Sequence, residues 1–247
     1  MSTPDNGKVI AILQSNYIPW KGYFDIIAAV DEFVIFDEAQ YTRRDWRNRN
    51  KIVLDGKLKW LTIPVASKGA FHDSVTAVEI ADADWARNHW MNIAHAYARA
   101  PYFNVYGPLF KVLYDRAAKL KFLSEINELF LRALSSALGI EAHFFRAESI
   151  PRNTSNPTSR LVEICLNREA RGYVSGPAGK LYIDRAQFKE AGISLSFANY
   201  GGYPEYGQAR KTFEHGVSVV DLIMNCGQQA REHLKSFQDR SGFLEAD

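Results

Sequence analysis

Two uninterrupted apolar runs near the N-terminus give the first indication of the fold. Residues 9–13 and 33–36 show no polar alternation, which is typical of strands covered on both faces. Between them, Pro19 precedes a segment from about residue 20 to 30 whose apolar positions recur at helical spacing. Such a short crossover predicts two parallel neighbouring strands. Their carboxyl ends would then open on the same edge of a sheet.

The following segments combine a hairpin with a long helical region. Apolar runs at residues 52–54 and 58–65 flank Asp55-Gly56, a pair that suits a tight primed turn. Residues 75–80 fit a further short strand. From about residue 84 to 139 the apolar positions recur every three or four residues, with breaks expected at Pro101 and at Gly107-Pro108. We expect a helical insertion here that ends at Gly139.

Strand and helix patterns then alternate almost to the end of the chain. Strands are expected at residues 142–145, 172–175 and 193–197, and helices at about 159–171, 184–191 and 217–226. This alternation predicts an α/β fold: a Rossmann-like, mostly parallel sheet flanked by helices, with a helical insertion and a small β-hairpin. A single domain over residues 1–247 is expected. The polar residues after Gly227 are expected to fray.

Composition and charge narrow the functional classes only a little. With 247 residues, 47% of them apolar, the chain can bury a sizeable core. A formal net charge of +2 neither demands nor excludes nucleic acid. Cys165 and Cys226 lie on apolar-periodic stretches without metal-ligand spacing, so buried free thiols are expected. We find no apolar leader and no run of about 18 to 20 apolar residues, and therefore expect a cytoplasmic protein without a membrane span.

The turn after the first strand is the first candidate site. Trp20 and Tyr23 offer flat faces for a base or sugar, Gly22 permits close backbone approach, and Lys21 at a helix N-terminus can hold a phosphate. The alternative is a packed turn whose aromatic residues belong to the core. In placement this turn resembles the HxGH turn of adenylyl-transferring enzymes, although its histidines are absent. The substrate-binding residues expected here are Gln14, Tyr17, Trp20, Gly22 and Tyr23.

Paired carboxylates at the end of the second strand are the second candidate. Asp37 and Glu38 are expected to be catalytic, because a carboxylate at a strand end can take a proton from an attacking amine or orient a sugar hydroxyl. The arginines that follow suit a diphosphate, which they bind through bidentate hydrogen bonds. The competing interpretation is an internal ion-pair network. The substrate-binding residues expected here are Gln40, Arg47, Asn48, Arg49 and Asn50.

A glycine-containing loop between a later strand and helix is the third candidate. Ser175, Gly176 and Lys180 can bind a phosphate there, although the segment matches neither a P-loop nor a GxGxxG fingerprint, and a plain turn is the alternative. No serine lies in a GxSxG elbow. No metal site is expected, because the histidines show no ligand pattern. They are His72, His89, His95, His143, His215 and His233.

Short motifs follow one another along the chain in an order that is specific to one family. They are Gln14, Tyr17, Pro19-Trp20, Gly22-Tyr23-Phe24, Phe36-Asp37, Gln40, Trp46, Asn48-Arg49-Asn50, Trp60-Leu61, Pro64-Val65, Ala100-Pro101-Tyr102-Phe103, Arg160-Leu161, Tyr173-Val174-Ser175-Gly176-Pro177, Tyr182, Tyr200, Tyr206 and Leu222-Ile223-Met224-Asn225-Cys226-Gly227. With these motifs the chain resembles the WbqC-like protein family over residues 10 to about 227. Two departures are Glu38, where a second Asp is frequent, and Ser15-Asn16, which replace a common Pro-containing turn.

The resemblance implies a role in the biosynthesis of bacterial O-antigen (lipopolysaccharide) and other surface polysaccharides. The implied activity is an amide-forming transferase that moves an aminoacyl group such as glycyl, or a small acyl group, from an activated donor to the amino group of a nucleotide-linked amino sugar. Arg47 and Arg49 would hold a diphosphate, and Asp37 would take the amine proton or orient the sugar. Trp20 or Tyr23 would stack on a base.

Other functions stay open at this point. They are an ATP-dependent, adenylate-forming amide ligase and a non-catalytic sugar-nucleotide-binding protein. The sequence leaves several properties undetermined: the donor, with aminoacyl-tRNA among the candidates, the particular sugar, any cofactor or metal requirement, and the oligomeric state.

Overall fold

A six-stranded sheet forms the centre of the molecule. The computed structural model describes residues 7–66 and 74–246. The strand order is β5-β2-β1-β6-β7-β8, and all neighbours pair in parallel except β7 and β8, which are antiparallel. The predicted parallel pairing of the first two strands is confirmed. The strands are β1 (Val9–Leu13), β2 (Glu32–Ile35), β5 (His143–Arg146), β6 (Gly172–Ser175), β7 (Ser194–Ala198) and β8 (Leu244–Ala246).

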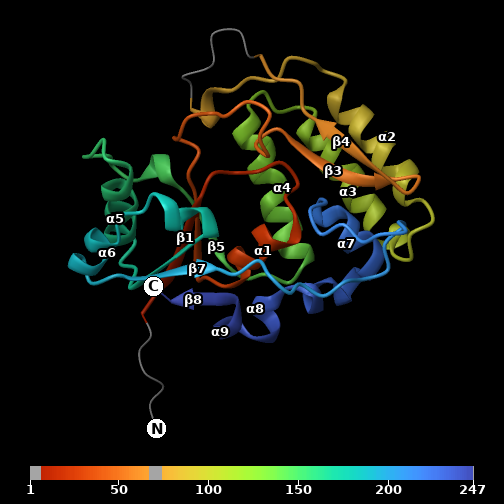
Figure 1. The fold of residues 1–247 in the computed structure, drawn as a ribbon. Coiled ribbons are helices and arrows are strands. Elements are labelled where there is room, and N and C mark those ends of the chain that lie inside the picture. Colours follow the sequence, from red (N-terminus) through yellow and green to blue (C-terminus); the bar gives the residue numbers. More distant parts are fainter. Residues whose placement is uncertain (1–6, 67–73, 247) are drawn as a thin grey trace.

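Helices cover both faces of this sheet, as Figure 1 shows. The helices α5 (Pro157–Asn167) and α6 (Arg185–Glu190) pack on the face that carries Ile10 and Ile12 of β1. The opposite face, which carries Ala11, packs against α1 (Lys21–Ala28) and α4 (Leu123–Ala137). Burial on both sides explains why β1 is an unbroken apolar run. The α/β class and the mostly parallel sheet predicted from sequence are confirmed.

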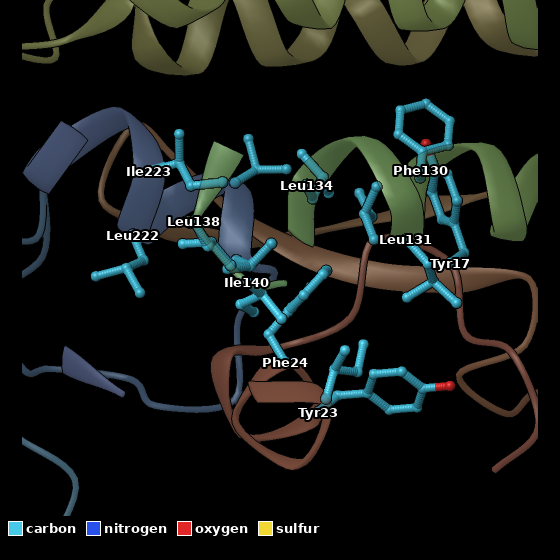
Figure 2. Close-up of a cluster of buried hydrophobic side chains, with 14 of the residues drawn as sticks. Tyr17, Tyr23, Phe24, Phe130, Leu131, Leu134, Leu138, Ile140, Leu222 and Ile223 are labelled. Carbon is cyan, nitrogen blue, oxygen red and sulfur yellow. The ribbon is translucent and has the colours of Figure 1, made fainter. Parts of the chain in front are cut away.

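The helical region extends the core on one side of the sheet. It contains α2 (Trp85–Tyr97), α3 (Phe103–Ala117) and α4, and α7 (Val219–Cys226) packs against α3. Figure 2 shows Leu131, Leu134 and Leu138, from α4 and its C-cap, in one cluster with Phe24 of α1. Gly139 ends this region with φ of +70°, as expected of a helix stop. The insertion and the sheet therefore share one hydrophobic cluster.

The hairpin forms a second sheet of its own. It consists of β3 (Arg49–Leu54) and β4 (Lys57–Thr62), which pair in antiparallel register. Asp55 and Gly56 both have positive φ, +50° and +71°, which matches the predicted primed turn. The sequence prediction of a small hairpin is confirmed, with the first strand beginning three residues earlier than expected.

Two local predictions in this half of the chain are wrong. Residues 75–80 form a 3-10 helix, Val75–Ala77, and isolated bridges rather than a strand, because Val75 and Val78 are buried at helical rather than alternating positions. Gly107-Pro108 does not break the helix but lies inside α3. Pro108 removes one backbone donor. Burial of Phe110, Leu113 and Tyr114 further along the same helix outweighs that loss.

The C-terminal residues are ordered rather than frayed. After the 3-10 segment Gly227–His233, two short helices, α8 (Lys235–Gln238) and α9 (Arg240–Phe243), lead into β8. Leu234 and Phe243 have no exposed surface. The buried carboxylate of Asp25 in α1 accepts the backbone N–H groups of Lys235 and Ser236, both at 2.8 Å. Widely spaced apolar residues and a distant carboxylate hold this segment, which is why its local polarity was misleading.

Within residues 7–66 and 74–246, none of the helices has the length and apolar character needed to cross a membrane. In the same part of the chain Cys165 and Cys226 are buried and free, as expected. His72 lies outside the described residues.

Candidate functional site

The carboxyl ends of β1, β2, β5 and β6 share one edge of the sheet. The chain passes from β1 to β2 on one side, whereas β6 later joins β1 on the other side. In open α/β sheets, ligands bind in the crevice where the connections diverge in this way. The loops that carry Gln14, Asp37 and Ser175 therefore meet at the edge where such proteins bind ligands.

Asp37 is a fully buried carboxylate that joins three elements. Its Oδ1 accepts the backbone N–H of Ser15 at 2.7 Å, and its Oδ2 accepts the hydroxyls of Ser15 and of Ser124 at the start of α4. Burial raises the pKa of Asp37, against the hydrogen bonds from Ser124 and Ser15 and the charge of Arg47. Asp37 has no exposed surface, so in this structure the carboxylate fixes the loop after β1 and does not face a ligand.

Asn127 completes this arrangement from the next turn of α4. Its side-chain nitrogen donates to the Ser15 hydroxyl at 3.0 Å and to the carbonyl of Arg47 at 2.9 Å. Ser124 and Asn127 come from the helical insertion, more than 80 residues away from Asp37 in the chain. No local pattern around Asp37 points to them. A weak signal exists in α4 itself, where two polar side chains one turn apart interrupt the apolar face.

Glu38 is neutralised by a buried arginine of α5. Arg160, with 1% of its side chain exposed, donates from Nε and Nη2 to the two oxygens of Glu38, at 2.8 and 3.0 Å. The same guanidinium donates to Glu163 and to the carbonyls of residues 147, 150 and 151. The ion-pair network considered as the competing interpretation therefore describes Glu38. Both of its oxygens are occupied, which leaves it poorly placed to accept a substrate proton.

Glu148 is a third carboxylate at the same edge, and the sequence did not single it out. It follows β5 in a 3-10 turn, Ala147–Ser149, and is exposed. Partial desolvation of the carboxyl group and the nearby charges of Asp37 and Glu38 raise its pKa, while Arg146 acts in the opposite direction. Among the described residues, no other side chain forms a hydrogen bond or ion pair with it. Of the three carboxylates, Glu148 is the one that a ligand can reach.

Arg47 supplies positive charge beside the loop after β1. Its Nη1 donates to the side chain of Asn16 and, at 3.4 Å, to the carbonyls of Gln14 and Ser15. Its Nε is buried without a partner among the described residues. Its Nη2 makes a long contact with the carboxylate of Asp45, at 3.8 Å. Nη2 is therefore the part of the guanidinium that has donors left for an anion, since Nε is buried and Nη1 is used.

The turn after β1 divides between surface and core. Trp20 is half-buried, with its ring edge-on to Tyr200 at 4.8 Å and to Tyr203 at 5.6 Å. A Cβ at Gly22 would lie 2.3 Å from the Trp20 ring, so only glycine lets this ring fold over the start of α1. Tyr23 is buried and donates its hydroxyl to the carbonyl of Gln14 at 2.7 Å. Tyr23 therefore supports the site and offers no stacking face.

Tyr17 points into the core, away from the sheet edge. Its hydroxyl lies 2.8 Å from Nδ1 of His89 and 2.5 Å from the hydroxyl of Tyr114. Nε2 of His89 lies 3.2 Å from the carbonyl of Thr62, which can only accept, so Nε2 carries the proton and Nδ1 accepts from Tyr17. With no exposed surface, Tyr17 does not contact a ligand in this structure. An aromatic residue beside a polar loop gives no sequence signal for the direction of its ring.

Lys21, considered from sequence as a phosphate ligand, is buried among aromatic rings. Its Nζ donates to the carbonyl of Pro204 at 2.7 Å and lies over the rings of Tyr203, Tyr206 and Phe213, 5.1 to 5.4 Å from their centres. Burial lowers the pKa of Lys21 to about 8, although Cys226, Asp25, Glu205 and Asp221 act in the opposite direction. This placement removes the ammonium group from the sheet edge.

The polar residues around the start of β3 have different roles. Asn48 and Asn50 are buried: Asn48 donates to the carbonyl of Ile63, and Asn50 donates to those of Tyr17 and Ile18. Asn50 thereby holds Ile18, which has an unusual φ of +35°. Arg49 lies on the outer face of the hairpin, 4.4 Å from the centre of the Trp60 ring. Of the three, Arg49 is the one placed to contact a ligand directly.

The remaining predicted residues belong to β6, to the loop after it, and to the loop after β2. Ser175 is buried, and a Cβ at Gly179 would lie 2.4 Å from its hydroxyl, so the loop after β6 packs tightly over it. Gly176 is next to the hydroxyl of Tyr200. Lys180 forms an ion pair with Glu245 of β8, two strands away from β6. Gln40 is exposed, and its carbonyl accepts a hydrogen bond from Gln14 at 3.1 Å.

A cavity of about 290 Å³ lies between the turn after β1 and the start of the hairpin. Two tryptophans, Trp20 and Trp46, form part of its wall. Among the described residues, no three His, Cys, Asp or Glu side chains are grouped so that they could hold a metal ion. The site thus combines an aromatic cavity, a guanidinium and an exposed carboxylate along one side of the molecule.

Comparison with known proteins gives a family for this arrangement. A family model described as the WbqC-like protein family matches residues 14–233, a range that begins directly after β1 and includes Asp37, Arg47, Glu148 and the lining of the cavity. The chain belongs to the WbqC-like protein family. A relative from Mycobacterium tuberculosis strain H37Rv, the uncharacterized protein Rv1507c, is 40% identical over 228 residues, which cover 92% of this chain and 98% of the relative. No solved structure matches the chain.

The residues that hold the site of this WbqC-like protein together were only partly visible in its sequence. The motifs located Asp37, Trp20 and Gly22, and the run of arginines after Asp37 located Arg47. They did not single out Ser124, Asn127 or Glu148, since these contacts cross between the insertion, β5 and β2. Arg160 stood among the family motifs without a role. Its burial next to Glu38 provides one.

Proposed function

We propose that this protein is an amide-forming transferase that acts on the amino group of a nucleotide-linked amino sugar in surface-polysaccharide biosynthesis. The group transferred is an aminoacyl group such as glycyl, or a small acyl group, from an activated ester or thioester donor. The observation that carries the proposal is the exposed carboxylate of Glu148 at the same sheet edge as the guanidinium of Arg47, whose Nη2 makes only a long contact, 3.8 Å, with Asp45. Membership of the WbqC-like family supports a biosynthetic role.

In the proposed reaction, Glu148 acts as the general base. An ammonium group cannot attack a carbonyl until it loses a proton, and a carboxyl group with a raised pKa is the stronger base for that transfer. The amine nitrogen then forms a C–N bond with the donor carbonyl carbon, and the C–O or C–S bond to the carrier breaks. The nitrogen gives up a second proton as the amide forms; of the two protons, Glu148 passes one to the departing oxygen or sulfur, and the other goes to solvent.

Arg47 is proposed to bind the diphosphate of the sugar nucleotide. A guanidinium presents donors in a fixed fork that matches phosphate oxygens. We assign Asp37 a positioning role, because its oxygens hold the Ser15 loop and α4 and have no exposed surface. We assign Glu38 the same kind of role through Arg160. These assignments replace the proton transfer that the sequence alone favoured for the Asp37–Glu38 pair.

The test is acyl transfer by purified protein to a panel of nucleotide-linked amino sugars, followed by mass spectrometry of the amide product. Glu148→Gln should lower kcat by about 10²-fold or more, the usual contribution of a general base. Glu141→Gln is the matched control, because Glu141 is an exposed carboxylate that precedes the same strand. It should keep full activity. Equal activity in both variants would remove Glu148 from the mechanism.

The donor class is decided by the same assay. Amide formation from amino acid and ATP, with amino-acid-dependent pyrophosphate exchange, would replace the transferase by an adenylate-forming ligase. A folded protein that binds sugar nucleotides but forms no amide with any donor class would instead be a binding protein.

A further inference from the structure

We propose that the cavity beside Trp46, together with the ammonium group of Lys51, is a binding site for a nucleoside phosphate. The base would occupy the cavity and the phosphate would lie on Lys51. The site is argued from residues that the acyl-transfer mechanism does not use; only the identity of the nucleotide rests on the proposed function.

The cavity has the shape and chemistry of a site for a flat aromatic group. Its lining is Asn16, Pro19, Trp20, Trp46, Asn50 and Gly216. Two indole rings and a proline present apolar faces on which a base can stack. A volume of about 290 Å³ is at the small end of the range for ligand pockets, which suits a single base better than a larger group.

One polar group in the wall is free to recognise an edge of the base. The amide of Asn50 is fully used, since its nitrogen donates to Tyr17 and Ile18 and its oxygen accepts the N–H of Lys51 at 2.8 Å. Asn16 differs: its oxygen accepts from Arg47, but within the described residues its side-chain nitrogen has no partner. That nitrogen can donate to a carbonyl or ring nitrogen of a base.

Lys51 places an ammonium group without an ion-pair partner among the described residues at the rim of the same cavity. Its Nζ lies 5.9 Å from the ring centre of Trp46 and 5.8 Å from that of Trp60, and a Cβ at Gly216 would be 3.6 Å from it. Among the residues that the structure describes, no carboxylate pairs with this ammonium group. Oε1 of Glu214 lies near the same Gly216 position, 3.0 Å from that Cβ, without forming an ion pair with Lys51. An ammonium group between two indoles that is not ion-paired can bind an incoming phosphate.

The surrounding surface is basic although the chain as a whole is nearly neutral. Residues 43–59 contain seven Lys or Arg and two Asp, a net charge of +5, whereas the whole chain has +2, so the remainder sums to −3. Trp46 and Trp60 are 41% and 43% exposed, with ring centres 5.5 Å apart. Exposed indoles interleaved with cations are typical of surfaces that bind nucleotides.

The test is direct titration of the protein with uridine and adenosine mono- and diphosphates, by calorimetry and tryptophan fluorescence. Trp46→Ala and Lys51→Gln should each weaken binding by about 10-fold or more, through lost stacking and a lost charge-assisted contact. Lys119→Gln is the matched control, since Lys119 is exposed, lies outside residues 43–59 and does not line the cavity. It should stay within twofold of the wild type. The absence of saturable binding, or equal affinity in Trp46→Ala, Lys51→Gln and the wild type, would overturn the proposal.

A second arm identifies the source of the nucleotide. A short single-stranded RNA with an unpaired 3′ end is titrated against the same variants at two salt concentrations. If RNA binds at least tenfold more tightly than mononucleotides, with a steep loss at high salt, the base belongs to an RNA-linked donor. If nucleoside diphosphates bind as well as RNA, it belongs to the sugar nucleotide. Either result supports the site.

Failure of this inference is distinguishable from failure of the proposed function. Nucleotide binding that depends on Trp46 and Lys51, without any amide product, would keep the site and remove the transferase. Amide formation that is unaffected by Trp46→Ala and Lys51→Gln would do the reverse.

Discussion

Glu38 at the end of β2 and Arg160 in α5 form a bidentate pair across 122 residues of chain, with N···O distances of 2.8 and 3.0 Å. Arg160 is also the largest fully buried side chain described. The pair links the sheet edge to α5, which covers the face that carries Ile10 and Ile12. It holds the end of β2 in place, directly beside Asp37.

Replacing Arg160 should therefore cost stability rather than binding alone. Arg160→Met leaves Glu38 as a buried carboxylate without its partner and also removes donors to three backbone carbonyls, so we expect a loss of about 3–5 kcal/mol of unfolding free energy. Urea denaturation measures it. Arg132→Met is the control, because Arg132 is exposed and its partner Glu128 keeps a second arginine, Arg146; it should cost less than about 1 kcal/mol. A similar small loss in both variants would contradict the assignment.

His89 should make the stability of the protein depend on pH in the acidic range. Burial lowers its pKa to about 4, below the ordinary value of 6.5, so the unfolded chain takes up the proton first. Stability is fully present above about pH 6.5 and falls by up to about 3 kcal/mol as the pH drops towards 4. Denaturation of His89→Gln should lack this slope. His95→Gln, an exposed histidine of the same helix, should retain it; a slope that survives in His89→Gln would place its origin elsewhere.

Lys21 should make the stability of the protein depend on pH in the alkaline range. Its folded pKa of about 8 lies below the ordinary 10.5, so the unfolded state holds the extra proton between these values and stability rises as pH increases from 8 to 10.5. We expect a gain of up to about 3 kcal/mol, because each unit of difference between the two pKa values is worth about 1.4 kcal/mol. Lys21→Met should remove the rise in urea-denaturation midpoints measured at pH 7.5 and 10. The exposed Lys119→Met should leave it intact.

Even the smallest side chain at position 22 should destabilise the protein. Gly22→Ala places a methyl group 2.3 Å from the Trp20 ring, which must leave its position, and we expect a loss of about 1–3 kcal/mol. Since Trp20 lines the cavity, nucleotide affinity should fall in the same variant. Gly207→Ala is the comparison, because a Cβ there would have no neighbour within 4 Å. Thermal unfolding and titration that do not distinguish the two variants would speak against this packing.

The C-terminal segment should contribute strongly to stability. Phe243 has no exposed surface, and Phe243→Ala should cost about 3–5 kcal/mol in chemical denaturation. Leu181→Ala, at a position that is 88% exposed, should change the same measurement by less than about 0.5 kcal/mol. A frayed C-terminus would make both substitutions equally harmless.

The sequence predicted those parts of the fold that depend on local apolar pattern. β1, β2 and β6 are short apolar runs buried on both faces, and the Asp55-Gly56 turn follows from the residues in the turn itself. The direction of Tyr17 and the partner of Glu38 could not be predicted, because each is decided by helices that lie far along the chain. The contacts of Ser124 and Asn127 could not be predicted for the same reason. Lys180 was misleading because its partner, Glu245, lies in a segment expected to be frayed.

The hydrogen bonds from Ser124 and Asn127 to Asp37 and the Ser15 loop bear on how members of this family can be recombined. The insertion cannot be exchanged on its own, because the buried carboxylate of Asp37 at the end of β2 accepts a hydrogen bond from Ser124 of α4. A chimera that imports residues 84–139 from another member should fold only if the graft brings a hydroxyl to position 124 and an amide to position 127. Natural variation at these two positions is therefore expected to track the residue at position 37.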